Sequence, residues 1–183
     1  MAKKNNGKQL EEDIQKSCND QNIFFYRIKD VNPVFLKKGA MVSKNDYDSF
    51  VYKKPNLFPM EFKSTEEKRS ISFDEKIIKS HQIKALQKAS NHDGLIAGFV
   101  FNFKRFENET WFVHINEFVE LKRVAENQIK EYTYKSKLNK SSISLDNCRE
   151  IGVQLLNRKK KVKYTYYVNK LLDELIERYG DIE

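Results

Sequence analysis

The chain has 183 residues, which at roughly 150 residues per domain fits a single domain with its own buried core. Its 34 Lys and Arg against 26 Asp and Glu give a formal charge of +8, which favours a polyanionic partner such as nucleic acid. Hydrophobic residues make up 39% and include 13 Phe and 9 Tyr, which excludes disorder as the overall class.

No segment has the length and apolar character of a membrane span. The longest apolar stretch, Gly94 to Phe101, is far shorter than the about 20 residues that a spanning helix needs. The N-terminal residues turn polar and acidic where a secretory signal would be apolar. We therefore expect a cytoplasmic protein without a membrane partner. The two cysteines, Cys18 and Cys148, lack metal-binding spacings and are expected to be ordinary buried thiols.

The first third of the chain predicts one helix and a hairpin. Leu10, Ile14 and Cys18 recur at helical spacing and predict an amphipathic helix over residues 7–22. Segments rich in β-branched and aromatic residues, or with period-two alternation, predict strands at 23–28, 46–54 and 57–64. Because Lys54-Pro55-Asn56 supplies a turn, the last two strands are expected to pair as a hairpin.

The rest of the chain alternates helical and strand patterns. Helices are expected over residues 73–89, 116–125 and 164–179. Strands are expected over residues 94–103, 111–115 and 151–156. Residues 65–72 and 128–142 are polar and are expected to be loops. Helices and strands interleaved in this way predict a mixed α/β fold.

The hairpin would bring carboxylates and a lysine together. Glu61 and Lys63 share one face of their strand, and Asp46 and Asp48 share one face of the strand before it. Across the hairpin, an aspartate can meet Glu61 and form an oxygen-lined site that suits Mg²⁺. A Glu/Lys alternation is also typical of a solvated strand face, so this pattern alone leaves both interpretations open.

A site of this kind fits phosphodiester hydrolysis. The reaction needs an activated water, in-line attack and relief of negative charge in the transition state. A metal on Asp46 and Glu61 would serve most of these needs. The compact ammonium of Lys63 would contact the scissile phosphate and hold the attacking water.

Five segments in a fixed order carry a resemblance to a known family. They are residues 7–13, 46–48, 61–65 with Lys68, 81–83 and 94–101. In these segments the chain resembles the Asp…Glu-x-Lys nuclease superfamily, and within it the RecU-type Holliday junction resolvases. The resemblance covers most of residues 7–115 and, more weakly, residues 144–175. It implies a restriction-endonuclease-like fold, with a mixed central sheet flanked by helices.

The resemblance also implies an activity. The chain would be a homodimeric endonuclease that resolves four-way DNA junctions by paired symmetric cuts with Mg²⁺, with Mn²⁺ expected to substitute. Two other functions stay open. One is a restriction-like or repair nuclease that acts on duplex, flap or single-stranded DNA. The other is a non-catalytic DNA-binding module on the same fold.

Residue roles follow from the same resemblance. Asp46 and Glu61 take the metal-ligand places and Lys63 that of the catalytic lysine, with Asp48 as the alternative to Asp46. Gln82 falls where the family has a glutamine near the catalytic centre, although a helix-surface amide is an equal interpretation. Supporting places near the metal or phosphate fall to Glu11, which can also be a solvated first-turn acid, and to His81.

Basic residues around the site are the candidates for phosphate contacts. They are Lys37, Lys38, Lys68 and Arg69, with Thr65 beside them. The long basic stalk of the resolvases is replaced here by residues 31–45 alone, read as a short stalk or basic loop. The basic run at 158–161 is either a further DNA contact or, as such runs usually are, a solvated loop.

Overall fold

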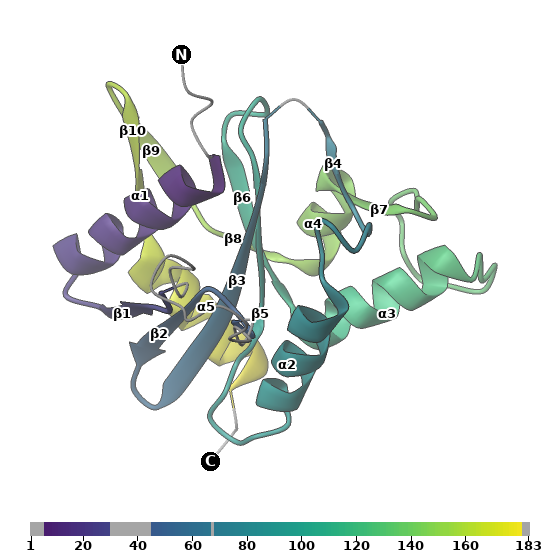
Figure 1. Ribbon diagram of the computed structural model, residues 1–183, viewed down its shortest axis with the longest axis horizontal. Coiled ribbons are helices and arrows are strands. Elements are labelled where there is room, and N and C mark those ends of the chain that lie inside the picture. Colours follow the sequence, from purple (N-terminus) through teal and green to yellow (C-terminus); the bar gives the residue numbers. More distant parts are fainter. Residues whose placement is uncertain (1–5, 30–44, 67, 181–183) are drawn as a thin grey trace, which may run out of the picture.

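The computed structural model describes residues 6–29, 45–66 and 68–180 (Figure 1). Its centre is a six-stranded sheet with the order β1-β2-β3-β5-β6-β8. The pair β3–β5 is parallel, and the other neighbours are antiparallel. The strands are β1 Phe24–Arg27, β2 Ser49–Lys53, β3 Asn56–Thr65, β5 Gly98–Phe103, β6 Glu109–His114 and β8 Val153–Gln154.

Helices cover both faces of this sheet (Figure 1). One face carries α1 Asn6–Asp20 and α5 Val168–Tyr179. The other carries α2 Ser80–Ser90, α3 Ile115–Glu126 and α4 Leu145–Ile151. Two short ribbons complete the fold, β4 Ser70–Ser72 with β7 Ser142–Ser144 and β9 Asn157–Lys160 with β10 Lys163–Tyr166. The expected mixed α/β class, a mixed sheet between helices, is thus confirmed.

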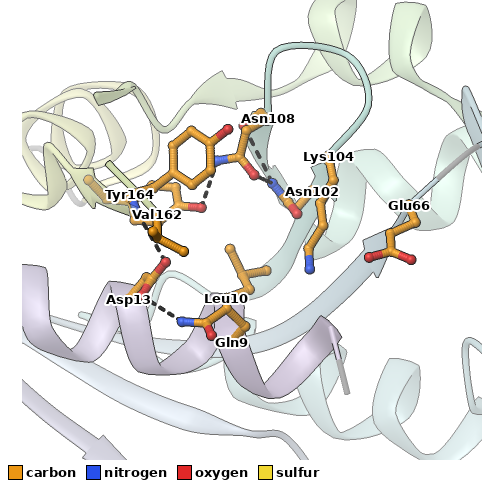
Figure 2. Close-up of a pocket in the computed structure, with 10 residues that line it drawn as sticks. Gln9, Leu10, Asp13, Glu66, Asn102, Lys104, Asn108, Val162 and Tyr164 are labelled. Atoms are coloured by element: carbon orange, nitrogen blue, oxygen red, sulfur yellow. Dashed lines mark hydrogen bonds between the residues drawn. The ribbon is translucent and has the colours of Figure 1, made fainter. Parts of the chain in front are cut away.

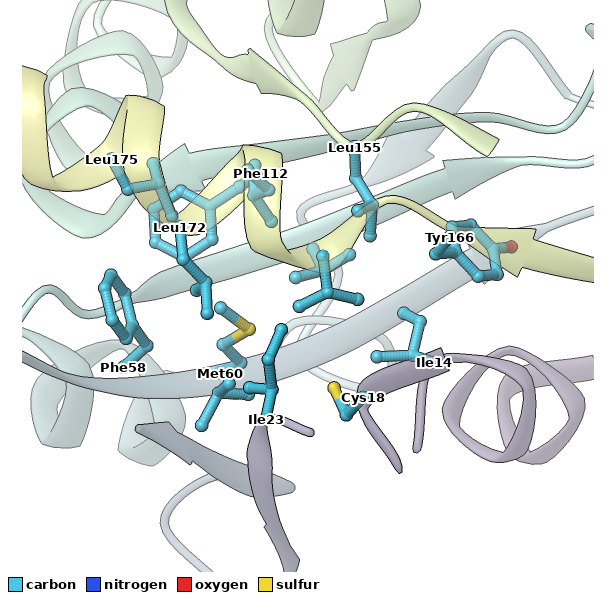
Figure 3. Packing of buried hydrophobic residues seen from close by; sticks show 14 of the residues in the cluster. Ile14, Cys18, Ile23, Phe58, Met60, Phe112, Leu155, Tyr166, Leu172 and Leu175 are labelled. Carbon is cyan, nitrogen blue, oxygen red and sulfur yellow. The ribbon is translucent and has the colours of Figure 1, made fainter. Parts of the chain in front are cut away.

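Alternation along β3 decides which side chains enter which layer. Met60 and Phe62 pack with α1 and α5, in the layer shown in Figure 3. Phe99 and Phe101 of the neighbouring strand pack on the opposite face, against α3. Because side chains two apart share a face, Glu61 lies with Phe99 on the α2 side of the sheet.

Several expected boundaries were wrong in the middle of the chain. The helix expected over 73–89 begins only at Ser80, because the Glu75 carboxylate accepts the Ser80 backbone N–H at 3.0 Å and caps the helix there. The expected loops at 65–72 and 128–142 contain β4 and the first residue of β7. These segments pair through their backbones, with Ile71 opposite Ile143.

The observed elements of the C-terminal part differ more from those expected from the sequence. The strand expected over 151–156 is reduced to β8, because Ile151 ends α4, a helix that Ser144 caps by accepting the Asn147 N–H. The final helix begins at Val168, because residues 163–166 form β10.

Other expectations are confirmed or lie outside the described residues. Cys18 and Cys148 are free and buried. No helix in the described ranges is long and apolar enough to cross a membrane. Of the segment 31–45, read as a short stalk, only residue 45 is described.

Candidate metal-binding site on strand β3

The site lies where β3 outlasts its neighbour β2. The last residue pair between the two strands is Ser49 with Met60, whereas β3 runs on to Thr65 and pairs there only with β5. The Asp48 side chain occupies the edge left open by β2. Its Oδ2 accepts the Phe62 backbone N–H at 2.8 Å, a donor that a longer β2 would have used.

Glu61 is the central group of the site. Its side chain is 2% exposed. Oε1 accepts two hydrogen bonds, from Lys63 Nζ at 2.7 Å and from Gln82 Nε2 at 2.6 Å. Lys63 Nζ also donates to Gln82 Oε1 at 3.1 Å, so the three side chains form a closed triangle. The other carboxylate oxygen, Oε2, is buried and receives no hydrogen bond from an N–H or hydroxyl of the described residues. The Glu61 carboxyl also hydrogen-bonds to that of Asp48.

Electrostatics in this site work against two ionised carboxylates. Burial, together with the nearby Asp48 charge, raises the pKa of Glu61 to about 7, although Lys63 pulls it the other way. Burial also raises the pKa of Asp48, against the opposing effects of the Phe62 N–H and the Lys63 charge. A divalent cation between the two carboxylates would offset this unfavourable charge.

The donor set fits Mg²⁺. This ion takes one or two carboxylates and fills its other positions with waters and substrate phosphate oxygens. Asp48 and Glu61 supply two adjacent carboxylates, and no N–H or hydroxyl of the described residues donates to Glu61 Oε2. The described residues hold no cluster of three or more His, Cys, Asp and Glu side chains of the kind that encloses a metal.

Helix α1 borders the site through Glu11. This carboxylate is largely buried and forms an ion pair with Arg27 of β1. The Arg27 charge in turn acts to lower the pKa of Asp48. Glu11 is thus linked to the carboxylate pair indirectly, by an ion pair with Arg27, whose charge acts on Asp48.

The structure brings Asp48, and not Asp46, to Glu61. Asp46 was the preferred ligand from sequence, but it is exposed and lies outside β2, which begins at Ser49. The strand expected from residue 46 starts three residues late, and the register then sets Asp48 next to the β3 edge. The alternative noted from sequence is the one that the geometry favours.

The other expected residues divide into two groups. Gln82, in the first turn of α2, contacts both Glu61 and Lys63. His81 is half-buried at the preceding position, about 100° around the helix, and within the described residues it forms no hydrogen bond with the site.

The phosphate-contact candidates lie near the end of β3. Thr65 is its last residue, and its Oγ1 accepts the Lys68 N–H at 3.4 Å. Lys68 is exposed, whereas Arg69 is bound to Asp146 at 2.7 Å and lies over the Phe106 ring. A groove of about 630 Å³ follows this strand end, lined by Thr65, Lys68 and the serines of β4. Lys37 and Lys38 lie outside the described residues.

A second cavity, of about 300 Å³, lies on the α1 side of the sheet (Figure 2). Its wall includes a buried polar network that the sequence did not indicate. Asn102 Nδ2 donates to Asn108 Oδ1 at 3.0 Å, and Asn108 Nδ2 donates to the Tyr166 hydroxyl at 2.9 Å. Asn102 Oδ1 accepts from Ser64 Oγ, which connects this network to β3. No local motif marks such amides, because their partners are distant in sequence.

The fold and the site together define a mixed α/β protein with a buried carboxylate pair and an adjacent lysine. No protein-family model matches the chain. The chain is 56% identical over 178 residues to the SPbeta prophage-derived uncharacterized protein YotM of Bacillus subtilis (strain 168), across 97% of this chain and 90% of YotM. It therefore belongs to the same family as YotM.

Among solved structures, a similar chain is Hjc, a Holliday junction resolvase of Archaeoglobus fulgidus. The TM-score is 0.47 at 14% sequence identity, over 81% of this chain and 95% of that one. A likeness this distant carries no weight in assigning residues or activity.

Proposed function

We propose that the chain is a Mg²⁺-dependent endodeoxyribonuclease with a restriction-endonuclease-like fold that resolves four-way DNA junctions. The observation that carries the proposal is the buried Glu61 carboxyl, which lies against that of Asp48 and whose Oε2 receives no hydrogen bond from an N–H or hydroxyl of the described residues. That oxygen belongs to a carboxylate whose pKa the Asp48 charge helps to raise, and whose other oxygen is bound by Lys63. A buried carboxylate oxygen that receives no hydrogen bond is costly, and a bound cation would offset that cost.

In this proposal Asp48 and Glu61 hold the metal. Bound there, Mg²⁺ would act as a Lewis acid toward the phosphate and would acidify a water. Lys63 directs its ammonium to the scissile phosphate and orients the attacking water. Gln82 keeps Lys63 and Glu61 in register by bonding to both, so that the lysine is already positioned when substrate binds.

The substrate class follows from charge and from the sequence resemblance to junction resolvases. A formal charge of +8 favours binding through phosphates. Lys37, Lys38, Thr65 and Lys68 are proposed phosphate contacts beside the site. Two symmetric cuts in a junction need two opposed sites, so the active form is proposed to be a homodimer.

The test uses a labelled synthetic four-way junction and a duplex of equal length, each with Mg²⁺ or EDTA. We expect paired symmetric nicks in the junction only, lost with EDTA and lost in Lys63→Ala. Equal cutting of the duplex would instead make the chain a restriction-like nuclease. Tight binding without cleavage under Mg²⁺ or Mn²⁺ would make it a non-catalytic DNA-binding module.

A further inference from the structure

The β9–β10 ribbon gathers positive charge that the site on β3 does not use. Residues 157–166 contain no Asp or Glu. The ribbon carries five cationic side chains, all exposed: Arg158, Lys159, Lys160, Lys161 and Lys163. At its tip Val162 is 82% exposed. Figure 1 shows the ribbon projecting beside α1.

These charges do not stabilise the fold. None of the five cations forms an ion pair with any residue that the structure describes. Lys160 lies directly opposite Lys163, and like charges at opposed positions destabilise a strand pair. Lys161 has a φ of 45°, a conformation that favours glycine over a residue with a side chain. Neither feature stabilises the ribbon locally.

The base of the ribbon is nevertheless firmly held. The backbone N–H of Tyr166 donates to Ser17 Oγ at 2.9 Å, and that of Tyr164 donates to Asp13 Oδ2 at 3.2 Å. Asn157 Nδ2 donates to the Asn108 backbone oxygen at 3.0 Å. The ribbon is thus fixed against α1 and the sheet, whereas its tip extends into solvent.

A groove of about 280 Å³ separates the tip from α1. Four lysines line it, with Asp20 as the one acidic lining residue. The lysines are Lys16, Lys160, Lys161 and Lys163. A groove with this charge favours a polyanion over a neutral or cationic ligand.

Helix α1 connects the ribbon to the site. One side of this helix presents Glu11 to Arg27 next to the carboxylate pair, and Asp13 and Ser17 bind β10. The buried amide network joins Ser64 of β3 to Tyr166 at the ribbon base. The two features are therefore held in a fixed relation by direct contacts.

From these observations we propose that the β9–β10 ribbon is a second DNA-contacting element that binds the phosphate backbone of a double-stranded arm. It rests on the proposed function, since it assigns a further contact to the same branched DNA substrate. A two-stranded ribbon has the width to lie along a duplex groove, and its lysines would replace counterions on the phosphates.

The test compares two triple variants that remove the same charge. The tip variant removes three charges of the ribbon tip and carries Lys160→Ala, Lys161→Ala and Lys163→Ala. The control variant removes three exposed lysines of the segment before β7 and carries Lys130→Ala, Lys135→Ala and Lys137→Ala. Binding to the labelled four-way junction is measured in EDTA by fluorescence anisotropy over a range of salt. We expect the tip variant to bind at least about tenfold more weakly, with a salt slope smaller by about 2 to 3. The control triple is expected to stay within about twofold of wild type.

A tip variant that binds as wild type, or a control that loses as much affinity, would overturn the proposal. A wild-type protein that binds in this salt-sensitive, tip-dependent way but never cleaves would overturn the nuclease and leave the ribbon assigned. Cleavage that needs Lys63, with binding and cleavage both unchanged when the tip lysines are removed, would overturn the ribbon assignment and leave the nuclease proposal standing.

A single substitution separates binding from folding. Lys161→Gly removes one tip charge and at the same time places glycine at the positive φ. We expect weaker junction binding with no fall in the melting temperature. Wild-type affinity in this variant would contradict a phosphate contact at Lys161.

Discussion

Asp48 and Glu61 illustrate how one backbone contact can fix the relative position of two carboxylates. Asp48 is held by the Phe62 N–H, and Phe62 itself points into the opposite layer, where it packs with the apolar core. The backbone of β3 therefore positions both carboxylates, one through its hydrogen bond and one through its own side chain. Displacing either carboxylate by about an ångström would change the spacing between the two carboxylates.

The first prediction separates the two candidate aspartates. Asp48→Asn is expected to lower junction cleavage at least about a hundredfold, because it removes a metal ligand, and to spare junction binding. Asp46→Asn removes the same charge two residues away, at an exposed position, and is expected to cleave within about twofold of wild type. Gel-based cleavage rates give the answer, and the opposite ranking would return the ligand role to Asp46.

The second prediction concerns the stability of the apo protein. Glu61→Gln removes a buried charge next to Asp48, and its amide can still accept the hydrogen bond from Lys63. We expect cleavage to be lost while the melting temperature rises by a few degrees, at about 2–4 °C for each kcal/mol recovered. Calorimetry without metal measures this. A clear fall in the melting temperature would mean that the charged carboxylate stabilises the fold.

At the scale of elements, His114 joins β6 to α3. Its Nδ1 accepts the Asn116 N–H at 3.3 Å and caps the helix, and its ring stacks on Tyr179 at 4.5 Å. Burial, with the Arg178 charge, lowers the pKa of His114 to about 4 from the usual 6.5. Between pH 6.5 and about 4, His114 therefore binds a proton in the unfolded chain but stays neutral in the folded chain.

The third prediction follows from that shift. The contribution of neutral His114 to the free energy of unfolding is fully present above pH 6.5. It is lost as the pH falls toward 4, because the unfolded state takes up a proton that the folded state does not. His114→Asn keeps a capping oxygen and removes the titration. Melting temperatures measured from pH 7.5 to 4.5 should fall less steeply in this variant. Parallel profiles for both proteins would contradict a neutral His114.

Elements with a strong local pattern could be predicted from the sequence. The stripe of Leu10, Ile14 and Cys18 identified α1, and the β2–β3 hairpin followed from alternation around Lys54-Pro55. Glu61 and Lys63 were expected on one strand face, and the family order suggested a place for Gln82 near them, with a helix-surface amide as an equal interpretation. In the structure the three side chains are in contact.

The features that could not be predicted from the sequence depend on contacts between residues far apart in the chain or on the exact end of a strand. Residues 158–161 have the composition of a solvated loop, and residues 158–160 belong to β9 because Tyr164 and Tyr166 of its partner strand are anchored on α1. The choice between Asp46 and Asp48 required the end of β2, which alternation locates only to within a few residues.

At the scale of the whole molecule, the described residues of one chain bring Asp48, Glu61, Lys63 and Gln82 together. A homodimer would therefore carry this arrangement twice. Exposed aromatic side chains lie at the β1 edge of the sheet: Phe24, Tyr26 and Tyr52.

The fourth prediction uses mixed dimers. Wild type and Asp48→Asn are co-expressed with different tags, and the heterodimer is isolated by two affinity steps. We expect it to nick one strand of each junction, while the wild-type homodimer cuts two. Sedimentation of the wild type should give twice the chain's mass. A monomer that makes paired cuts would show that symmetry is not required.

Helix α1 is held by contacts that span most of the chain. Gln21 bonds to Tyr166 and Asp13 to Tyr164, across 145 and 151 residues. During synthesis α1 leaves the ribosome well before its partners on β10, so its docking waits for them. Glu11 travels with α1. A nascent chain can therefore form the β2–β3 hairpin early, yet the border of its reactive site closes only when translation has passed β10.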